Sequence, residues 1–148
     1  MGNVSHGARR AMPAGGSGND RRMLAQLSTI GFIPSADLER SRTFYERALG
    51  LAVTYADGFA LVLGSGPSQI RLVAAGEFRA QPFTVAGWEA PDITTTVTGL
   101  LANGVVFERY DAMVQDELGI WTAPSGDRVA WFRDPDGNVL SLTSHQAG

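Results

Sequence analysis

Few side chains in this sequence can act as nucleophiles, bases or metal ligands. The chain has no cysteine, which excludes thiolate nucleophiles, disulfides and cysteine-based zinc sites. All 12 basic residues are arginine, so a Schiff base on lysine is excluded as well. Histidine occurs only at His6 and His145, in the two terminal regions. Carboxylates and arginines remain as the groups that could do chemistry.

Two carboxylates, Asp134 and Asp136, lie close together in the stretch "WFRDPDGNVLSL" at 131–142. Paired carboxylates can serve as general acid and base. Asp, Pro and Gly in this order are also what a tight hairpin turn requires, for side-chain hydrogen bonds to the backbone and for a positive φ. We interpret both aspartates as turn residues, and we expect His145 to be exposed to solvent.

Charge and hydropathy exclude several classes of protein. The formal net charge is −3, and from Met23 onward 8 arginines stand against 14 acidic residues. Nucleic acid is therefore not expected as a partner, because its binding needs a basic face. No apolar run approaches the ~20 residues that span a bilayer, and the N-terminus has no secretory signal. We expect no membrane association and a cytoplasmic location.

The composition also divides the chain into two parts. Residues 1–22 are rich in Gly, Ser, Pro, Asn and Asp, which predicts a flexible leader. The remaining residues, 23–148, are long enough for a single domain with its own hydrophobic core.

One order of elements occurs twice after the leader. Asp37 and Asp92 are typical N-cap residues, and each precedes apolar residues at helical spacing. The first copy is predicted to contain a strand at 24–34, a helix at 37–50 and strands at 51–56, 59–64 and 69–75. The second is predicted to contain a strand at 83–90, a helix at 92–104, strands at 105–110, 128–133 and 139–144, and a long loop at 111–127.

The repeat predicts an α+β fold of two βαβββ modules, at about 24–75 and 83–145. Each module has one helix, which can cover only one face of its strands. The other face must meet the second module, a partner chain or a ligand.

Three stretches carry a resemblance to a known family: "DLERSRTFYERALGL", "WEAPDI" and "WFRDPDGNVLSL". Together with the repeat, they resemble the vicinal oxygen chelate superfamily over 24–145. This superfamily includes glyoxalase I, extradiol dioxygenases, and fosfomycin and bleomycin resistance proteins. The resemblance implies a cupped mixed sheet with the helices on its outer face, and it implies a homodimer.

Metal-dependent relatives in this superfamily bind a divalent ion through His, Glu or Gln at four positions in the cup. The resemblance places Ile30, Arg71, Val85 and Ser141 at these positions. Two of these side chains are hydrocarbons, and arginine is a cation without an acceptor. A catalytic divalent metal needs about three His or carboxylate donors. We expect neither a metal nor any other cofactor at this site.

Strand alternation assigns the neighbours of these residues to the cup or to the core. Phe32 shares a face with Ile30, and Gly87 and Glu89 share a face with Val85. The opposite face, toward the helix, is apolar in both strands.

The three tryptophans differ in what they predict. Trp88 alternates toward the core. Either Trp131 or Phe132 shares a face with Ser141, depending on the hairpin register, and we favour Trp131. Trp121 lies in the long loop. Trp121 and Trp131 either stack on a ligand or serve packing and a dimer contact.

Two interpretations of Arg71 stay open. In an apolar cup its guanidinium could bind a carboxylate, a phosphate or an enolate. Alternatively, Arg71 forms an ion pair with an internal acid such as Glu89, or is exposed at the rim.

The sequence favours a metal-independent protein that binds a small, partly aromatic or apolar molecule in the cup. The acidic chain favours a cationic ligand. An alternative is a metal-free or atypical enzyme of the lyase or isomerase type, with Arg71 stabilising an oxyanion and Glu89 as base. A metal-dependent glyoxalase or dioxygenase comes third. The predicted ligand-binding residues are Ile30, Phe32, Arg71, Val85, Gly87, Glu89, Trp121, Trp131 and Ser141.

Overall fold

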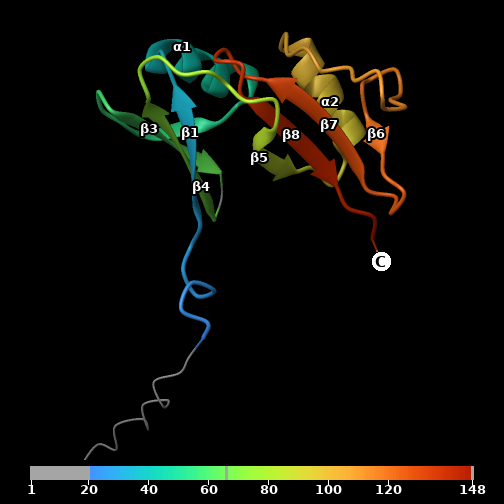
Figure 1. Ribbon diagram of the computed structural model, residues 1–148, viewed down its shortest axis with the longest axis horizontal. Helices are drawn as coiled ribbons and strands as arrows, with labels where there is room; N and C mark the ends of the chain where they lie inside the picture. The colour runs from blue at the N-terminus through green and yellow to red at the C-terminus, as the bar shows by residue number, and fades with distance from the viewer. Residues whose placement is uncertain (1–20, 66, 148) are drawn as a thin grey trace, which may run out of the picture.

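The computed structural model describes residues 21–65 and 67–147 (Figure 1). Of the predicted leader, 1–22, only Arg21 and Arg22 fall within the described residues, where they begin an exposed turn. No helix in the described part of the chain is long and apolar enough to cross a membrane.

The first module forms a four-stranded mixed sheet with one helical segment. The strand order is β1-β4-β3-β2, with β1 parallel to β4 and the other pairs antiparallel. The elements are β1 (Ile30–Ser35), α1 (Leu38–Thr43), the π-helix η1 (Phe44–Ala48), β2 (Ala52–Ala56), β3 (Ala60–Ser65) and β4 (Ser68–Ala74).

The first strand differs from its prediction at both ends. Residues 24–26 are turns, β1 begins at Ile30, and Pro34 lies inside the strand instead of ending it. Proline is tolerated here because β1 is an edge strand, where one side of the backbone needs no hydrogen bonds.

The second module repeats this arrangement with the order β5-β8-β7-β6. The strand β5 runs parallel to β8, and the other pairs are antiparallel. The elements are β5 (Thr84–Glu89), α2 (Ile93–Ala102), β6 (Trp121–Thr122), β7 (Arg128–Arg133) and β8 (Val139–Ser144). The α+β class with two βαβββ-like modules is confirmed, and each module has a sheet of its own.

The prediction of a strand at 105–110 was wrong, because the backbone of this segment pairs with the sheet only at an isolated bridge between Phe107 and Phe132. The side chain of Gln115 explains the difference. Its amide group donates to the carbonyl of Glu108 at 3.0 Å and accepts from the amide of Tyr110 at 2.8 Å. Backbone groups that a strand would pair are therefore satisfied by a side chain. The fourth strand is β6, inside the predicted loop.

Both helices begin as predicted. The Asp37 carboxylate accepts the N–H of Arg40 at 3.1 Å, and that of Asp92 accepts the N–H of Thr95 at 3.1 Å. Gly50 follows the first helical segment with φ +72°, a value that favours glycine. Capping thus overrides the low helix propensity of the threonine run in α2.

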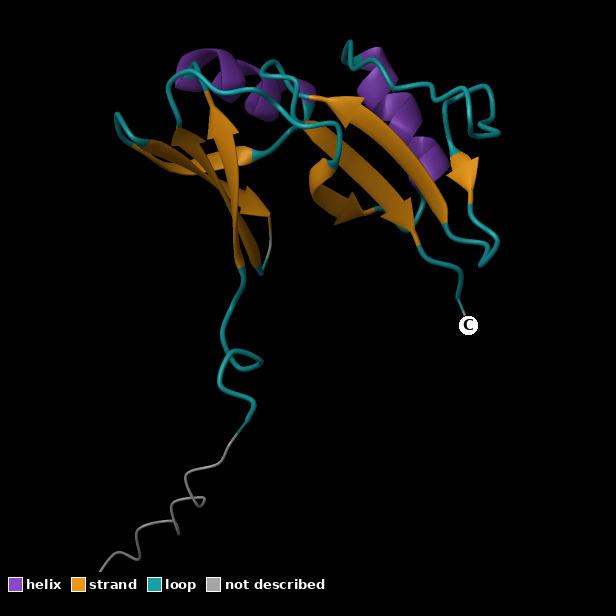
Figure 2. Ribbon diagram, viewed as in Figure 1, coloured by secondary structure: helices purple, strands orange, loops and turns teal. Residues whose placement is uncertain are grey.

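A single hydrophobic cluster joins the helices to both sheets. Figure 2 shows both helices toward the top of the view, with the two sheets diverging below them. The helices contribute Tyr45, Ile93 and Val97 to this cluster. The strands contribute Ile33, Leu61, Leu63, Ile70, Leu72, Ala130, Phe132, Leu140 and Leu142.

The DPDG turn between β7 and β8 has the predicted turn chemistry. The Asp134 carboxylate accepts the N–H groups of Asp136 and Asn138, both at 2.9 Å. Gly137 has φ +87°. Asp134 and Asp136 are therefore turn residues, as expected from the sequence.

The same turn also binds the first module. The Asp136 carboxylate accepts the N–H of Ala36 at 3.0 Å, the Arg40 guanidinium at 2.8 Å and the Ser41 hydroxyl at 3.0 Å. The Tyr45 hydroxyl donates to Asp134 at 2.8 Å. The Asn138 amide donates to the carbonyl of Pro34 at 2.9 Å. We call Asp134, Asp136 and Asn138, with these partners, the inter-module clamp.

Candidate functional site

Each sheet has an open face, which is the face away from its helix. On the first sheet this face carries Ile30, Phe32 and Tyr55, whose exposed fractions are 40%, 62% and 57%. The register places Arg71 between Phe32 and Val62 on neighbouring strands. Cationic and apolar side chains therefore alternate on an exposed surface.

The Arg71 side chain is only partly exposed, and its Nε is buried without a hydrogen-bond partner in the described chain. The suggested ion pair with Glu89 is not formed. The Glu89 carboxylate instead lies 3.2 Å from Nε2 of His145, whose side chain is exposed as expected. This donor is unpaired but inaccessible, so a ligand could use it only after the Arg71 side chain moves.

The open face of the second sheet is organised around Ser141. The register places Trp131 beside Ser141, while Phe132 is buried on the opposite face. Gly87 is the neighbour of Ser141 on β5, and a Cβ atom on Gly87 would lie 2.5 Å from the Ser141 Oγ. Glycine is therefore needed to admit the serine, and the favoured position of Trp131 is correct. Trp88 packs against the core, as predicted.

Three aromatic rings meet on this face. The rings of Trp131 and Tyr110 have centroids 5.6 Å apart at an interplanar angle of 83°. The rings of Trp131 and Trp121 lie 6.1 Å apart at 37°. The separation and tilt of these rings fall in the range of favourable aromatic contacts.

Beside these rings is a cavity of about 240 Å³, which we call the aromatic pocket. Its walls are apolar or aromatic except for the hydroxyls of a threonine and a tyrosine. The residues that line it are Pro82, Phe83, Thr84, Tyr110, Met113, Trp131 and Val139. The chemistry of this lining suits an apolar or aromatic group.

Sequence reasoning missed Phe83, Tyr110 and Met113 as pocket residues. Phe83 and Tyr110 are terminal residues of the strands predicted at 83–90 and 105–110, and Met113 lies in the loop predicted at 111–127. Alternation along a strand says nothing about a loop that folds back over the sheet. The aromatic residues themselves were the available signal, since loop aromatics often have a role beyond the core.

The structure does not bring all predicted site residues together. A second cavity, of about 600 Å³, lies between β1–β4 and β5, and it is lined by Val85, Gly87 and Glu89 among others. Ile30 and Arg71 line neither this cavity nor the aromatic pocket. The β5–β8 register also shifts between Thr84 and Ala86, so strict alternation fails at Val85.

The residues at the four implied metal positions do not fit a divalent ion. Ile30 and Val85 offer hydrocarbon, Arg71 offers positive charge, and the Ser141 hydroxyl is packed against Gly87. Among the described residues, no group of three or more His, Cys, Asp or Glu side chains could hold a metal. No chemical step can therefore be assigned to a metal at this site.

Solved structures with similar folds come from several kinds of protein. The bleomycin resistance determinant encoded on the transposon Tn5 is 20% identical, with a TM-score of 0.66 over 82% of this chain and 99% of that chain. A bleomycin-binding protein complexed with bleomycin is 19% identical, with a TM-score of 0.64 over 81% and 99%. Lactoylglutathione lyase from Agrobacterium tumefaciens is 16% identical, with a TM-score of 0.63 over 80% and 93%.

At these identities the structural likeness shows the fold alone. No curated protein sequence matches the chain. The model of the family described as "Glyoxalase/Bleomycin resistance protein/Dioxygenase superfamily" matches residues 26–142. This span includes all of the inter-module clamp and nearly all of both modules and their open faces. The chain therefore belongs to the glyoxalase/bleomycin resistance protein/dioxygenase superfamily.

Proposed function

We propose that this protein is a metal-independent binder of a small, flat, partly aromatic molecule. The observation that carries the proposal is the aromatic pocket, where Trp131 meets Tyr110 and borders a cavity of about 240 Å³. Trp121 extends the aromatic surface beyond the cavity. A planar ligand would stack on these rings and bury apolar area. One of the solved structures with a similar fold is a bleomycin-binding protein, which agrees with such a role.

The net charge of −3 favours a ligand that carries positive charge. A cation over the face of a tryptophan gains further attraction from the ring. A flat molecule with a cationic substituent is therefore the preferred ligand class.

We propose that the binding protein is a homodimer. Ile30, Phe32 and Arg71 lie on the open face of the first sheet, whereas Trp131 lies on that of the second. The exposed apolar side chains of the first sheet would gain from being covered. A partner whose first sheet faces the second sheet of this chain would bring both sets of residues to one ligand.

A ligand screen that monitors thermal stability and tryptophan fluorescence tests the binding proposal. Planar aromatic cations should raise the melting temperature saturably, because they bind only the folded state. Trp131→Ala should raise Kd about tenfold, since a stacking face is lost. The matched control is Phe59→Ala, which removes an exposed aromatic ring from the β2–β3 turn. Equal losses in the two variants would contradict the proposal.

Metal analysis of the purified protein tests the metal-independent part. We expect less than stoichiometric Zn, Ni, Mn and Fe, and we expect ligand binding to survive treatment with a chelator. A tightly held equivalent of any of these metals would refute this part of the proposal.

An enzyme is the second candidate, and the unpartnered Nε of Arg71 favours it. The partly exposed guanidinium could stabilise an oxyanion that forms during a reaction, once the side chain turns its Nε toward the ligand. Glu89 would be the base, although its carboxylate already contacts His145. Conversion of a bound compound by the wild type, with loss of turnover but not of binding in Arg71→Gln, would establish the enzyme.

A further inference from the structure

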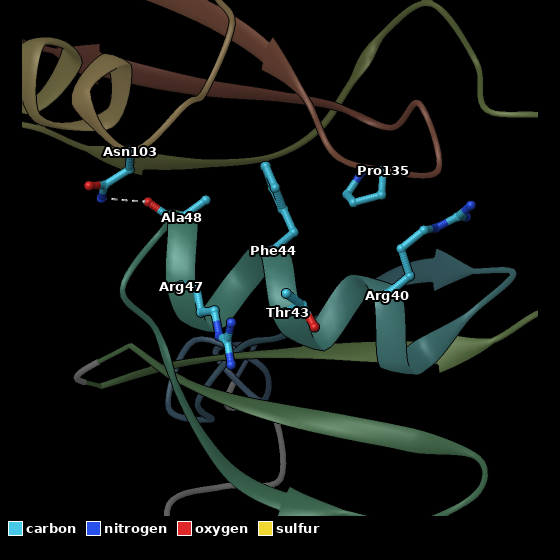
Figure 3. A pocket seen from close by; sticks show the side chains of 7 residues that line it. All are labelled: Arg40, Thr43, Phe44, Arg47, Ala48, Asn103 and Pro135. Atoms are coloured by element: carbon cyan, nitrogen blue, oxygen red, sulfur yellow. Dashed lines mark hydrogen bonds between the residues drawn. The ribbon is translucent and has the colours of Figure 1, made fainter.

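A groove on the helix side of the molecule has no part in the proposed binding site. Its volume is about 540 Å³, and three separate segments of the chain form its walls. One wall is α1 with η1, and the others are the residue after α2 and the DPDG turn (Figure 3). The residues that line it are Arg40, Thr43, Phe44, Arg47, Ala48, Asn103 and Pro135.

Part of the groove wall formed by α1 and η1 is a π-helical turn. Phe44, Arg47 and Ala48 belong to η1, in which the N–H of Leu49 donates to the carbonyl of Phe44 at 3.2 Å. A π-turn accommodates an extra residue, and such turns occur frequently at functional sites. The side chains of Phe44 and Arg47 both line the groove, but in Figure 3 Phe44 points toward the second module and Arg47 toward the opposite side of η1. A ligand that contacts both therefore requires the exposed Arg47 side chain to turn toward Phe44.

The charged side chains of the groove are both arginines, in a chain whose net charge is −3. Arg40 is half exposed and donates to Asp136, which uses part of its hydrogen-bonding capacity. Arg47 is exposed and has neither a hydrogen-bond nor an ion-pair partner among the described residues. The adjacent acid, Glu46, is already bonded to Arg42 at 2.7 Å. The groove therefore has an uncompensated positive charge.

The remainder of the groove combines apolar surface with one amide. Phe44 is half-buried and points toward the second module, with Pro135 beside it in Figure 3. The Asn103 Nδ2 donates to the carbonyl of Ala48 at 3.0 Å. Its Oδ1 accepts no hydrogen bond within the described chain and is available to a donor. A flat apolar body could lie on Phe44 and Pro135.

We propose that this groove binds a small molecule in which an oxyanion, a carboxylate or a phosphate, is carried on a flat apolar body. Arg47 binds the oxyanion, because a guanidinium fork matches the geometry of both groups. Phe44 and Pro135 hold the apolar body. This ligand class is opposite in charge to that of the aromatic pocket, so the two sites are distinct.

Titration of the ¹⁵N-labelled full chain by NMR tests the proposal. The probes are benzoate and phenyl phosphate, and the component probes are inorganic phosphate and phenol. The aromatic oxyanions should shift the amides of Phe44, Arg47 and Asn103, and the tighter of the two identifies the preferred oxyanion. Each component alone should bind at least about tenfold more weakly, because it lacks one of the two contacts.

Two matched variants locate the binding. Arg47→Gln should raise Kd about tenfold through loss of a charge-assisted contact. Arg128→Gln removes the same charge from the end of β7 that is remote from the DPDG turn and does not line the groove, and Kd should change less than about twofold. Trp131→Ala should leave this binding unchanged, which separates it from the proposed function.

Three results would overturn the proposal. The first is the absence of shifts at the groove with both aromatic oxyanions. The second is an equal effect of Arg47→Gln and Arg128→Gln, which would indicate a general charge effect. The third is loss of binding in Trp131→Ala, which would place the probes in the aromatic pocket.

Discussion

The carboxylate of Asp136 accepts hydrogen bonds from three donors of the first module. Only 2% of the Asp136 side chain is exposed. Water cannot replace these donors at so buried a position. Asparagine would keep the shape of the side chain, but it removes the charge and turns one acceptor into a donor. The residue is thus structural, although its sequence context suggested catalysis as one interpretation.

The first prediction concerns this carboxylate. Asp136→Asn should lower the free energy of unfolding by about 2–3 kcal/mol, because the Ala36 amide, the Arg40 guanidinium and the Ser41 hydroxyl lose a charged acceptor. Urea denaturation monitored by circular dichroism measures the change. The control is Asp111→Asn, an exposed aspartate for which a change below about 0.5 kcal/mol is expected. Similar losses in both variants would argue against the inter-module clamp.

The second prediction is the pH dependence of stability. Burial alone would raise the pKa of Asp136, but the Ala36 amide, the Ser35 and Ser41 hydroxyls and the Arg40 guanidinium together hold it below the ordinary 3.8. A carboxyl with a lowered folded-state pKa stabilises the protein fully above its unfolded-state pKa. That stability is lost as the pH falls through the folded-state pKa.

Unfolding free energies measured in urea between pH 6 and pH 3 should therefore decline below about pH 4. The decline should be shallower in Asp136→Asn, which has no group to titrate there. Parallel pH profiles for the wild type and the variant would contradict the assignment.

At the scale of single elements, a strand and a helix respond differently to the same substitution. In β5, Gly87→Ala places a methyl 2.5 Å from the Ser141 Oγ and 3.1 Å from its carbonyl oxygen. We expect a loss of about 1–3 kcal/mol from this overpacking. In α2, Gly99→Ala meets nothing within 4 Å and should stabilise by about 0.5–1 kcal/mol.

Thermal and urea unfolding of both alanine variants check this third prediction. The double variant Gly87→Ala with Ser141→Ala should regain part of the loss, since only the contact with the backbone oxygen remains. An unchanged stability of Gly87→Ala would show that β5 can move away from β8.

Elements defined by local chemistry could be predicted from the sequence. The strands β7 and β8 occur at Arg128–Arg133 and Val139–Ser144, as predicted, because the DPDG turn fixes where each one ends. Both helices follow from their aspartate caps. The hairpin register left Trp131 and Phe132 as alternatives from the sequence, and the favoured Trp131 is the one that lies beside Ser141.

Elements that depend on distant contacts could not be predicted. The strand β6 has only Trp121 and Thr122, and it forms where the side chain of Gln115 closes the preceding loop. The aromatic pocket depends on the same loop, because Tyr110 and Met113 reach Trp131 only after the chain folds back. No pattern of period 2 or 3.6 encodes such a path.

At the scale of the whole molecule, the open faces give a fourth prediction. If a second copy covers the first sheet, the wild type should sediment at twice the chain mass. Phe32→Asp should shift it toward the monomer, because a charge would be buried in the interface. Phe59→Asp is the control, since Phe59 is exposed in a turn outside that face. A monomeric wild type at micromolar concentration would contradict the homodimer.

The inter-module clamp limits how the two halves of the chain can be separated. The bonds from Tyr45 to Asp134 and from Asn138 to Pro34 join residues 89 and 104 positions apart. They can form only after residues 134–138 have been synthesised, and contacts of such long range slow folding. A cut in the connection at 75–83 would leave buried hydroxyl, amide and carboxylate groups without partners in both fragments. We therefore expect the two repeats to fold and unfold as one cooperative unit, in which neither half has the autonomy that its internal symmetry suggests.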